Sequence, residues 1–129
     1  MAACNMSEER VTLQMIKEAQ ERLKGVAQKT GLSYSNSVSD LAGCEVYLKL
    51  ENLQRTGSFK LRGAYNKVAS LTPEEREKGV IAASAGNHAQ GVALAASEYG
   101  CQSVICMPKH APLSKITATR GYGANVVLY

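Results

Sequence analysis

The first regular pattern of apolar positions along the chain is that of a helix. Its apolar residues recur with the period of an amphipathic helix and are Leu13, Ile16, Ala19 and Leu23. Thr12 precedes them as a suitable N-cap, and Gly25 is expected to end the helix. A polar loop over residues 30–39 follows, and a short helix is predicted over residues 38–42, closed by Gly43.

Beyond this helix, the pattern alternates between strands and helices. Residues 45–51 alternate apolar and polar side chains, which predicts a strand with one polar face. Apolar runs predict further strands, the first of them of the buried type, over residues 80–83, 103–107 and 124–129. Helical patterns cover residues 58–71, 73–78, 87–99 and 112–120. This order is typical of an α/β fold, in which helices flank both faces of a parallel sheet.

Several residues mark the ends and faces of these helices. Residues 72–75 (TPEE) predict a capping box with a proline at the first helical position. Gly91 is expected to let its helix approach the sheet closely, and Gly100 to end that helix. Pro112 is expected to start the last helix and Gly121 to stop it. The inward residues of the helix over residues 58–71 are expected to be Ala64, Tyr65, Val68 and Leu71.

The composition is that of a soluble globular protein with one domain of modest core. The chain has 129 residues, of which 45% are hydrophobic and 20% charged. No apolar run approaches the length of a membrane span, and residues 1–9 lack the profile of a signal peptide. We therefore expect a cytoplasmic protein with no membrane association. The net charge of +4 is dispersed along the chain, so nucleic-acid binding is not expected either.

The four cysteines, Cys4, Cys44, Cys101 and Cys106, are scattered and form no Cys-x-x-Cys pair. No paired histidines lie near them in the sequence. We interpret them as reduced thiols that mostly serve packing, rather than as a disulfide framework, and we expect no metal site.

Residues 58–64 (SFKLRGA) hold the first candidate for chemistry, Lys60. The turn over residues 55–57 separates it from the strand over residues 45–51, which places it near a helix start at the carboxyl end of a strand. A lysine held there beside Phe59 would suit a Schiff base with an aldehyde cofactor. The alternative, a solvated lysine on an amphipathic helix, is favoured by the local features alone.

Residues 84–88 (SAGNH) hold the second candidate. Gly86 is expected to permit a tight turn, and Asn87 to cap the helix that follows. The free N–H groups at that helix start would bind an anion. A reactive amine and an anion site together suit a substrate that carries a carboxylate.

Residues 56–64 (TGSFKLRGA) together with residues 84–91 (SAGNHAQG) resemble the threonine dehydratase (threonine ammonia-lyase) family. These are pyridoxal-phosphate enzymes of the tryptophan-synthase-β type, related to serine racemase, and the resemblance runs from about Thr12 to the end of the chain. It implies pyridoxal 5'-phosphate as cofactor and an amino acid as the small-molecule substrate. The implied reaction converts L-threonine to 2-oxobutanoate and ammonia, with L-serine to pyruvate left open.

The resemblance also implies roles for single residues. Lys60 would be the Schiff-base lysine and the base that removes the substrate α-proton, and Phe59 would flank the cofactor ring. Asn87 would hydrogen-bond the phenolic oxygen of the cofactor. The expected contacts of the substrate are Ser84, Gly86, Asn87 and His88, the last as a cap and carboxylate contact rather than an acid–base group. His110 is expected to be exposed, and Tyr99 and Tyr122 to serve packing.

Other positions discriminate among the relatives that the resemblance suggests. Ala85 stands where serine racemases of this group have a second serine, which favours dehydration over racemisation. Leu61 stands where cysteine and threonine synthases tend to have aspartate. Arg55 and Thr56 match the region where degradative members bind a nucleotide effector, although biosynthetic (isoleucine) and degradative (threonine catabolism) roles both stay open.

The resemblance implies that the chain is an N-terminal fragment of a two-domain, homo-oligomeric enzyme. Residues 1–11 would be a disordered tail, residues 12–44 a helix and loop of the large domain, and residues 45–129 a small α/β domain that ends mid-fold. Most of the large domain would be missing, including the glycine-rich loop for the cofactor phosphate, for which residues 121–124 (GYGA) are no substitute. A catalytically incompetent or partner-binding fragment is therefore an alternative. A generic nucleotide-binding domain is disfavoured, because the chain has no Gly-x-Gly-x-x-Gly or Walker loop.

Overall fold

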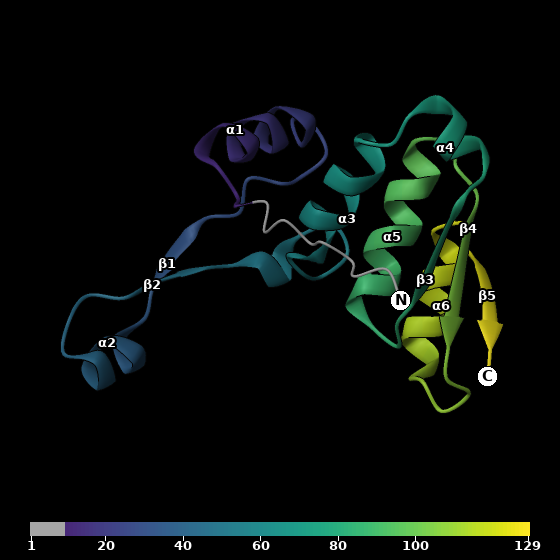
Figure 1. Cartoon of the computed structure of the whole chain (residues 1–129). Coiled ribbons are helices and arrows are strands. Elements are labelled where there is room, and N and C mark those ends of the chain that lie inside the picture. Colours follow the sequence, from purple (N-terminus) through teal and green to yellow (C-terminus); the bar gives the residue numbers. More distant parts are fainter. Residues whose placement is uncertain (1–9) are drawn as a thin grey trace, which may run out of the picture.

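A computed structural model describes residues 10–129 of the chain (Figure 1). The expected disordered tail therefore lies, for residues 1–9, outside the described residues, as does Cys4. The elements run in the order α1 (Leu13–Arg22), β1 (Leu32–Tyr34), α2 (Asn36–Ala42), β2 (Tyr47–Lys49), the 3-10 helix η1 (Glu51–Leu53), α3 (Lys60–Ala69), α4 (Pro73–Glu77), β3 (Val80–Ala83), α5 (Asn87–Glu98), β4 (Ser103–Met107), α6 (Leu113–Gly121) and β5 (Asn125–Leu128).

The centre of the fold is a parallel sheet with the strand order β3-β4-β5. Ala82 pairs with Ile105, and Ile105 with Val126, so these three side chains lie on one face of the sheet. That face carries the buried core, to which α5 and α6 contribute. The predicted α/β class with a parallel sheet and flanking helices is thus confirmed, and the strand over residues 103–107 has the predicted bounds.

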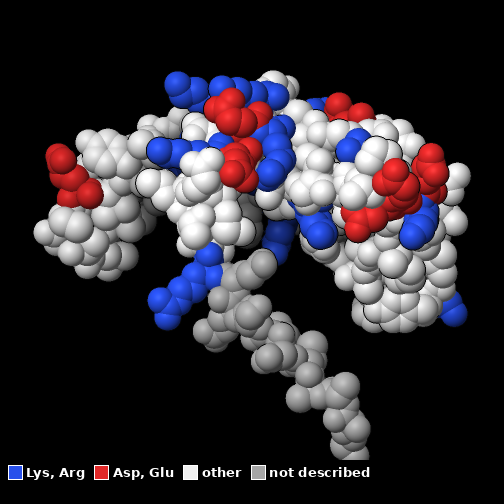
Figure 2. All heavy atoms as spheres, turned by 45° about the horizontal axis from the view of Figure 1, so that its top comes forward, with Lys and Arg blue, Asp and Glu red and all other residues white. Residues whose placement is uncertain are grey.

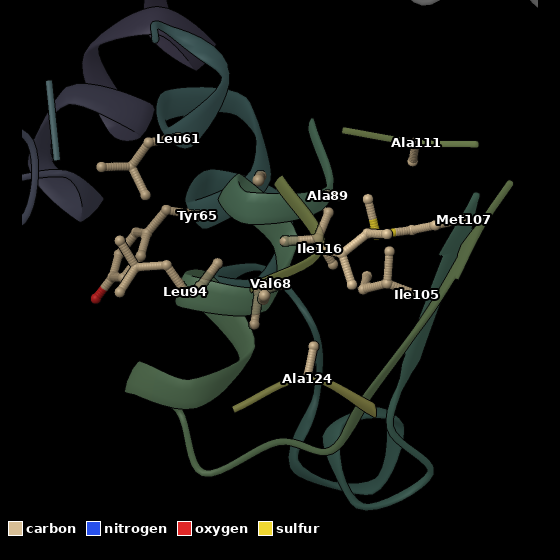
Figure 3. Packing of buried hydrophobic residues seen from close by; sticks show 14 residues of the cluster. Leu61, Tyr65, Val68, Ala89, Leu94, Ile105, Met107, Ala111, Ile116 and Ala124 are labelled. Carbon is tan, nitrogen blue, oxygen red and sulfur yellow. The ribbon is translucent and has the colours of Figure 1, made fainter. Parts of the chain in front are cut away.

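The hydrophobic core lies between this sheet face and the helices α3, α5 and α6 (Figure 3). The largest fully buried side chains are Leu61, Ile105, Met107 and Thr119. In α5, all residues from 89 to 96 are buried, because small side chains let the neighbouring elements pack close around this helix. Three of the four inward residues expected in α3, Ala64, Tyr65 and Val68, are buried, whereas Leu71 lies beyond its end and is only half-buried.

The other face of the sheet is open. Ile81, which points away from Ala82, is 75% exposed, and Val127 is 45% exposed. The expectations of a sheet covered on both faces and of a buried strand over residues 80–83 are therefore wrong for the described residues. The reason is that the hydrophobic core formed by the described residues lies on the sheet face that carries Ala82, together with the helices that contribute to this core.

The strand predicted over residues 45–51 is shorter and belongs to a second sheet. β2 pairs antiparallel with β1, a strand in the segment predicted as a polar loop. All residues of both strands are exposed, and the Tyr34 and Tyr47 rings meet edge to face at 5.4 Å between centroids. This two-stranded sheet, together with α2, which joins its strands, extends away from the parallel sheet (Figure 1). The alternating pattern identified an extended segment, but not its partner.

Several of the predicted helix ends are confirmed, although α1 already ends at Arg22, before the predicted Gly25. Thr12 caps α1, and Gly43 ends α2 with a φ of 68°. Thr72 and Glu75 form the predicted capping box of α4, with proline at the first helical position. Gly100, with a φ of 61°, follows α5 as expected.

The ends of α6 differ from the prediction. Pro112 is the N-cap residue rather than the first helical residue, and Gly121 is the last helical residue. The glycine with left-handed backbone is Gly123, at a φ of 87°, two residues before the start of β5. Residues 121–124 thus serve as a helix-to-strand turn.

No helix within residues 10–129 combines the length and the apolarity needed to cross a membrane. On the face shown in Figure 2, acidic and basic side chains are interspersed, in accord with the dispersed charge of the sequence.

Candidate active site

Lys60 is the first residue of α3, and its backbone packs against α5. A Cβ atom built on Gly91 would lie 3.3 Å from both the carbonyl carbon and the carbonyl oxygen of Lys60, and 3.4 Å from the Cβ of Ala64. Gly91 therefore allows close approach, as predicted, but to α3 and not to the sheet. Because Asn87 precedes Gly91 by about one helical turn, the start of α3 lies next to the start of α5.

The segment that leads into Lys60 differs from the prediction. It is not the carboxyl end of a strand of the parallel sheet, because β2 belongs to the two-stranded sheet. The 3-10 helix η1 also lies between β2 and α3. A turn with Gly57 at a φ of 71° brings the chain into α3, and the backbone N–H of Lys60 donates to Ser58 Oγ at 3.3 Å. The position of Lys60 is therefore set by helix packing rather than by a strand end.

The side chains of Lys60 and Phe59 are both exposed. Lys60 Nζ lies 5.2 Å from the centroid of the Phe59 ring, and Phe59 is 59% exposed. The amine is thus accessible to a solute, as a residue that is to react with a carbonyl compound must be.

The start of α5 is the second part of the site. Asn87 is the first helical residue, and the N-cap is Gly86, so the prediction of Asn87 as the N-cap is wrong. Gly86 has no side chain and α5 shows no side-chain cap hydrogen bond, so the first N–H groups of the helix have no side-chain partner within residues 10–129. Ser84 Oγ accepts a hydrogen bond from the Gly86 N–H at 3.3 Å, and the Ser84 N–H donates to the carbonyl of Cys106 in β4 at 3.0 Å.

Gly86 itself does not adopt the conformation that was expected to require glycine. Its φ is −150°, and a Cβ there would meet nothing within 4 Å. Because glycine has no side chain, the residue at this position cannot cap the helix, so the helix start carries no side-chain cap.

The side chain of Asn87 is held by Lys115, a residue that sequence reasoning missed. Lys115 Nζ donates to Asn87 Oδ1 at 2.6 Å. Lys115 lies in the first turn of α6, which follows β4, while Asn87 follows β3. Since β3 and β4 are parallel neighbours, both helices begin at the same edge of the sheet. A lysine soon after Pro112 was therefore a signal that the sequence contained.

His88 is exposed and lines a cavity of about 320 Å³ between α3, α5 and β3. Lys67, Leu71 and Ile81 also line this cavity. His110 is exposed, as predicted. Tyr99 and Tyr122 pack against the core, also as predicted.

Arg55 and Thr56 lie at the other end of α5. Arg55 Nη2 is 2.6 Å from Glu98 Oε1, and the Tyr122 hydroxyl donates to the Arg55 carbonyl at 3.2 Å. Thr56 is buried, and its Oγ1 has no hydrogen-bond partner among the described residues. Glu98 is separated from Asn87 by about 16 Å along the helix. The structure therefore separates these two residues from the Asn87 loop.

A bidentate ion pair holds the start of α3 to the preceding segment. Glu51 accepts hydrogen bonds from Arg62 Nε and Nη2, both at 2.8 Å, and from Thr30 Oγ1 at 2.8 Å. The hydrogen bonds from Arg62 lower the pKa of Glu51 to about 2, and the same contact raises the pKa of Arg62. Arg62 is two residues beyond Lys60, so this pair restrains the same helix start. This pair was not predicted from the sequence.

The fold and the site together define a class of protein. The chain is an α/β domain in which the helix start that bears an accessible primary amine packs beside a second helix start, whose first N–H groups have no side-chain cap. Comparison with known proteins specifies the class further. The family described as "Pyridoxal-phosphate dependent enzyme" matches residues 23–129, and the chain belongs to this family.

Individual relatives agree with this assignment. The chain is 63% identical over 118 residues to an L-threonine ammonia-lyase of Thermotoga maritima, with 92% of this chain and 29% of the relative covered. It is 53% identical over 119 residues to the catabolic L-threonine dehydratase TdcB of Escherichia coli, with 92% and 36% covered. A serine racemase structure from Dictyostelium discoideum superposes with a TM-score of 0.85 at 44% identity and covers 92% of this chain and 39% of that one. The chain thus spans about a third of the length of these relatives.

The described residues fit the family's cofactor in three respects. Lys60 provides an accessible primary amine for an aldehyde, and Asn87 provides a fixed amide. The open start of α5 provides N–H donors for a negatively charged group.

Proposed function

We propose that this chain carries the lysine-bearing part of the active site of a pyridoxal-phosphate-dependent ammonia-lyase that acts on L-threonine. The products would be 2-oxobutanoate and ammonia, and L-serine would be a second substrate giving pyruvate. The packing of Lys60 beside the start of α5 supports this proposal, in a chain that is 63% identical to an L-threonine ammonia-lyase.

The proposed role of Lys60 follows from its accessible amine. Lys60 would hold the cofactor through its amine, and the same amine would take up the proton of the substrate α-carbon. Pyridoxal phosphate, when bound, supplies an electron sink for the charge that develops at that carbon. Phe59, adjacent to Lys60, would cover one side of the cofactor ring. The Glu51–Arg62 pair and Gly91 would keep the Lys60 backbone in place.

The start of α5 would bind and orient the anionic groups. The Asn87 amide would donate a hydrogen bond to the phenolic oxygen of the cofactor. The substrate carboxylate would be held by the free N–H groups of the first turn together with Ser84, Gly86, Asn87 and His88. Ala85 provides no hydroxyl group for a proton transfer from the opposite side, which favours elimination over racemisation.

The setting of the whole enzyme is part of the same proposal. Residues 12–44 would belong to a large domain and residues 45–129 to a small domain of a homo-oligomeric, cytoplasmic enzyme. Arg55 and Thr56 would contribute to an effector site, and their distance from Asn87 along α5 is compatible with a role away from the chemistry.

The test is chemical labelling of the chain with pyridoxal phosphate. The chain is incubated with the cofactor, reduced with borohydride, digested, and analysed by mass spectrometry. We expect the reduced adduct on Lys60 and its loss in Lys60→Ala. Lys67, exposed on the same helix, is the matched control, and Lys67→Ala is expected to leave the adduct unchanged. An adduct mainly on another lysine would overturn the proposal.

A second candidate function is a catalytically incompetent or partner-binding domain. The share of the relatives' length that the chain spans, 29% and 36%, favours it. The discriminating measurement is 2-oxobutanoate formation from L-threonine by the 129-residue chain with pyridoxal phosphate added. Turnover that disappears in Lys60→Ala would eliminate this candidate.

A further inference from the structure

We propose that Lys115 is a positioning residue that decides which end of the Asn87 amide faces a bound ligand. This inference rests on the function proposed above, because it assigns the acceptor and donor sides of the site in which Asn87 takes part. Its basis is the hydrogen bond from Lys115 Nζ to Asn87 Oδ1, at 2.6 Å and half-buried.

The chemistry of the two groups makes this contact directional. An asparagine amide has a carbonyl oxygen that accepts and an NH₂ group that donates, and the two ends have nearly the same shape. A lysine ammonium group can only donate. Rotation of the amide by half a turn would bring the NH₂ group against the ammonium, so the contact is stable in one orientation only.

The packing of α6 keeps Lys115 in reach of Asn87. Ile116, the next residue, is 5% exposed and belongs to the core, and Thr119 is fully buried. The Thr119 hydroxyl donates to the Lys115 carbonyl at 2.7 Å. These contacts fix the backbone from which the lysine side chain extends, so the ammonium approaches Asn87 from the side of α6.

The consequence is that the site presents a donor to the ligand. With Oδ1 occupied by Lys115, Asn87 has its NH₂ group left for another partner. The N–H groups at the start of α5 are donors as well, and the Lys115 charge adds a cation nearby. A ligand group that accepts, such as a phenolate or carboxylate oxygen, is favoured at this place by the NH₂ group and the Lys115 charge, whereas a donor group finds Asn87 Oδ1 already engaged by Lys115.

The first arm of the test needs no ligand. The Asn87 NH₂ signals are identified in a ¹⁵N spectrum of the chain as the pair that is missing in Asn87→Asp. Their steady-state ¹H–¹⁵N NOE is then compared among wild type, Lys115→Met, Lys115→Gln and Lys115→Arg. We expect a high value in wild type, a fall in the Met and Gln variants, and recovery in Lys115→Arg, because arginine is also donor-only.

The Gln variant separates orientation from mere hydrogen bonding. Glutamine can hydrogen-bond to Asn87 with either of its ends, so it restores a contact without selecting one orientation. An Asn87 NOE that stays at the wild-type value in both Lys115→Met and Lys115→Gln would overturn the proposal. Retention in Lys115→Gln alone would overturn the directional part and leave only a structural contact.

The second arm uses pyridoxal phosphate as the probe, with binding followed by the absorbance of the cofactor. We expect about tenfold weaker binding in Lys115→Met and Lys115→Gln, and wild-type binding in Lys115→Arg. Equal affinity in all four proteins would refute a role toward the ligand. If wild type itself binds no cofactor, the proposed function fails, while the first arm still decides whether Lys115 orients Asn87.

Discussion

Gly91 and Lys60 are in direct contact across the α3–α5 interface. A Cβ atom on Gly91 would lie 3.3 Å from the carbonyl carbon and oxygen of Lys60, closer than side chains and backbone normally pack. The absence of a side chain at one position of α5 thus determines how near the candidate catalytic lysine lies to the start of that helix. Backbone cannot swing aside as a flexible side chain can, so the contact is sensitive to any added atom.

Gly91→Ala is therefore expected to destabilise the chain by about 1–2 kcal/mol through overpacking against α3. The loss is measured by urea unfolding followed by far-ultraviolet circular dichroism. The matched control is Gly63→Ala in α3, where an added Cβ would meet nothing within 4 Å. There the better helix propensity of alanine should stabilise by about 0.5–1 kcal/mol. Equal effects of the two substitutions would contradict the close packing at Gly91.

The Glu51–Arg62 ion pair is expected to make stability depend on pH. The pKa of Glu51 is lowered from 4.5 to about 2 in the folded chain. The stabilisation of the folded chain by the Glu51 charge is therefore fully present above about pH 4.5 and is lost as the pH falls towards 2. We expect Glu51→Gln to lower the free energy of unfolding by about 1–3 kcal/mol at neutral pH, because Arg62 loses a charged partner.

The measurement is urea unfolding of wild type and Glu51→Gln at several pH values. The difference between the two proteins is expected to shrink on acidification, because protonation removes the same charge from the wild type. Glu45→Gln is the control, since Glu45 is exposed and forms no ion pair with the residues described here. A difference that stays constant down to the lowest pH would exclude the ion pair as its source.

The two faces of the parallel sheet are expected to respond differently to truncation. Ile105 is fully buried on the covered face, whereas Ile81 is 75% exposed on the open face. Ile105→Ala should cost about 3–4 kcal/mol of unfolding free energy, and Ile81→Ala less than about 1 kcal/mol. Comparable losses at both positions would indicate that the open face is covered in solution. Urea titrations of both variants provide the comparison.

The described cysteines are expected to differ in reactivity by burial. Cys44 is exposed, whereas Cys101 is buried and its thiol contacts the carbonyl of Arg76 at 3.2 Å. Under native conditions, iodoacetamide should modify Cys44 at least about a hundredfold faster than Cys101, because Cys101 reacts only after local opening. Peptide mass spectrometry resolves the two sites. In denaturant the rates should converge, and similar rates without denaturant would contradict the burial of Cys101.

Much of the element order followed from local chemistry. Thr12, Gly43 and the capping box of α4 act within one helical turn, so the sequence around them was sufficient to place them. The same holds for the strand over residues 103–107, whose apolar run ends at a proline. The motif around Lys60 and Asn87 was recognisable because its residues are close in sequence.

The failures concern partners distant in sequence. The alternating pattern before Lys60 predicted a strand but could not show that β1, rather than the parallel sheet, pairs with it. Likewise, the pattern of residues 80–83 could not show that only one face of β3 is covered. Lys115 and the Glu51–Arg62 pair were missed because the partners in these contacts lie 28 and 11 positions apart in the chain.

The sequence by itself determined where the helices lie and several of their caps, most strands, the α/β class and the two segments that carry the candidate chemistry. These depend on interactions between residues a few positions apart, which leave periodic or short motifs. Only the tertiary structure decided that the Lys60 backbone packs closely against Gly91, that Lys115 hydrogen-bonds to Asn87, and that one sheet face stays open. Those relationships join residues 28 to 31 positions apart or depend on which face a helix covers, and packing in three dimensions creates them.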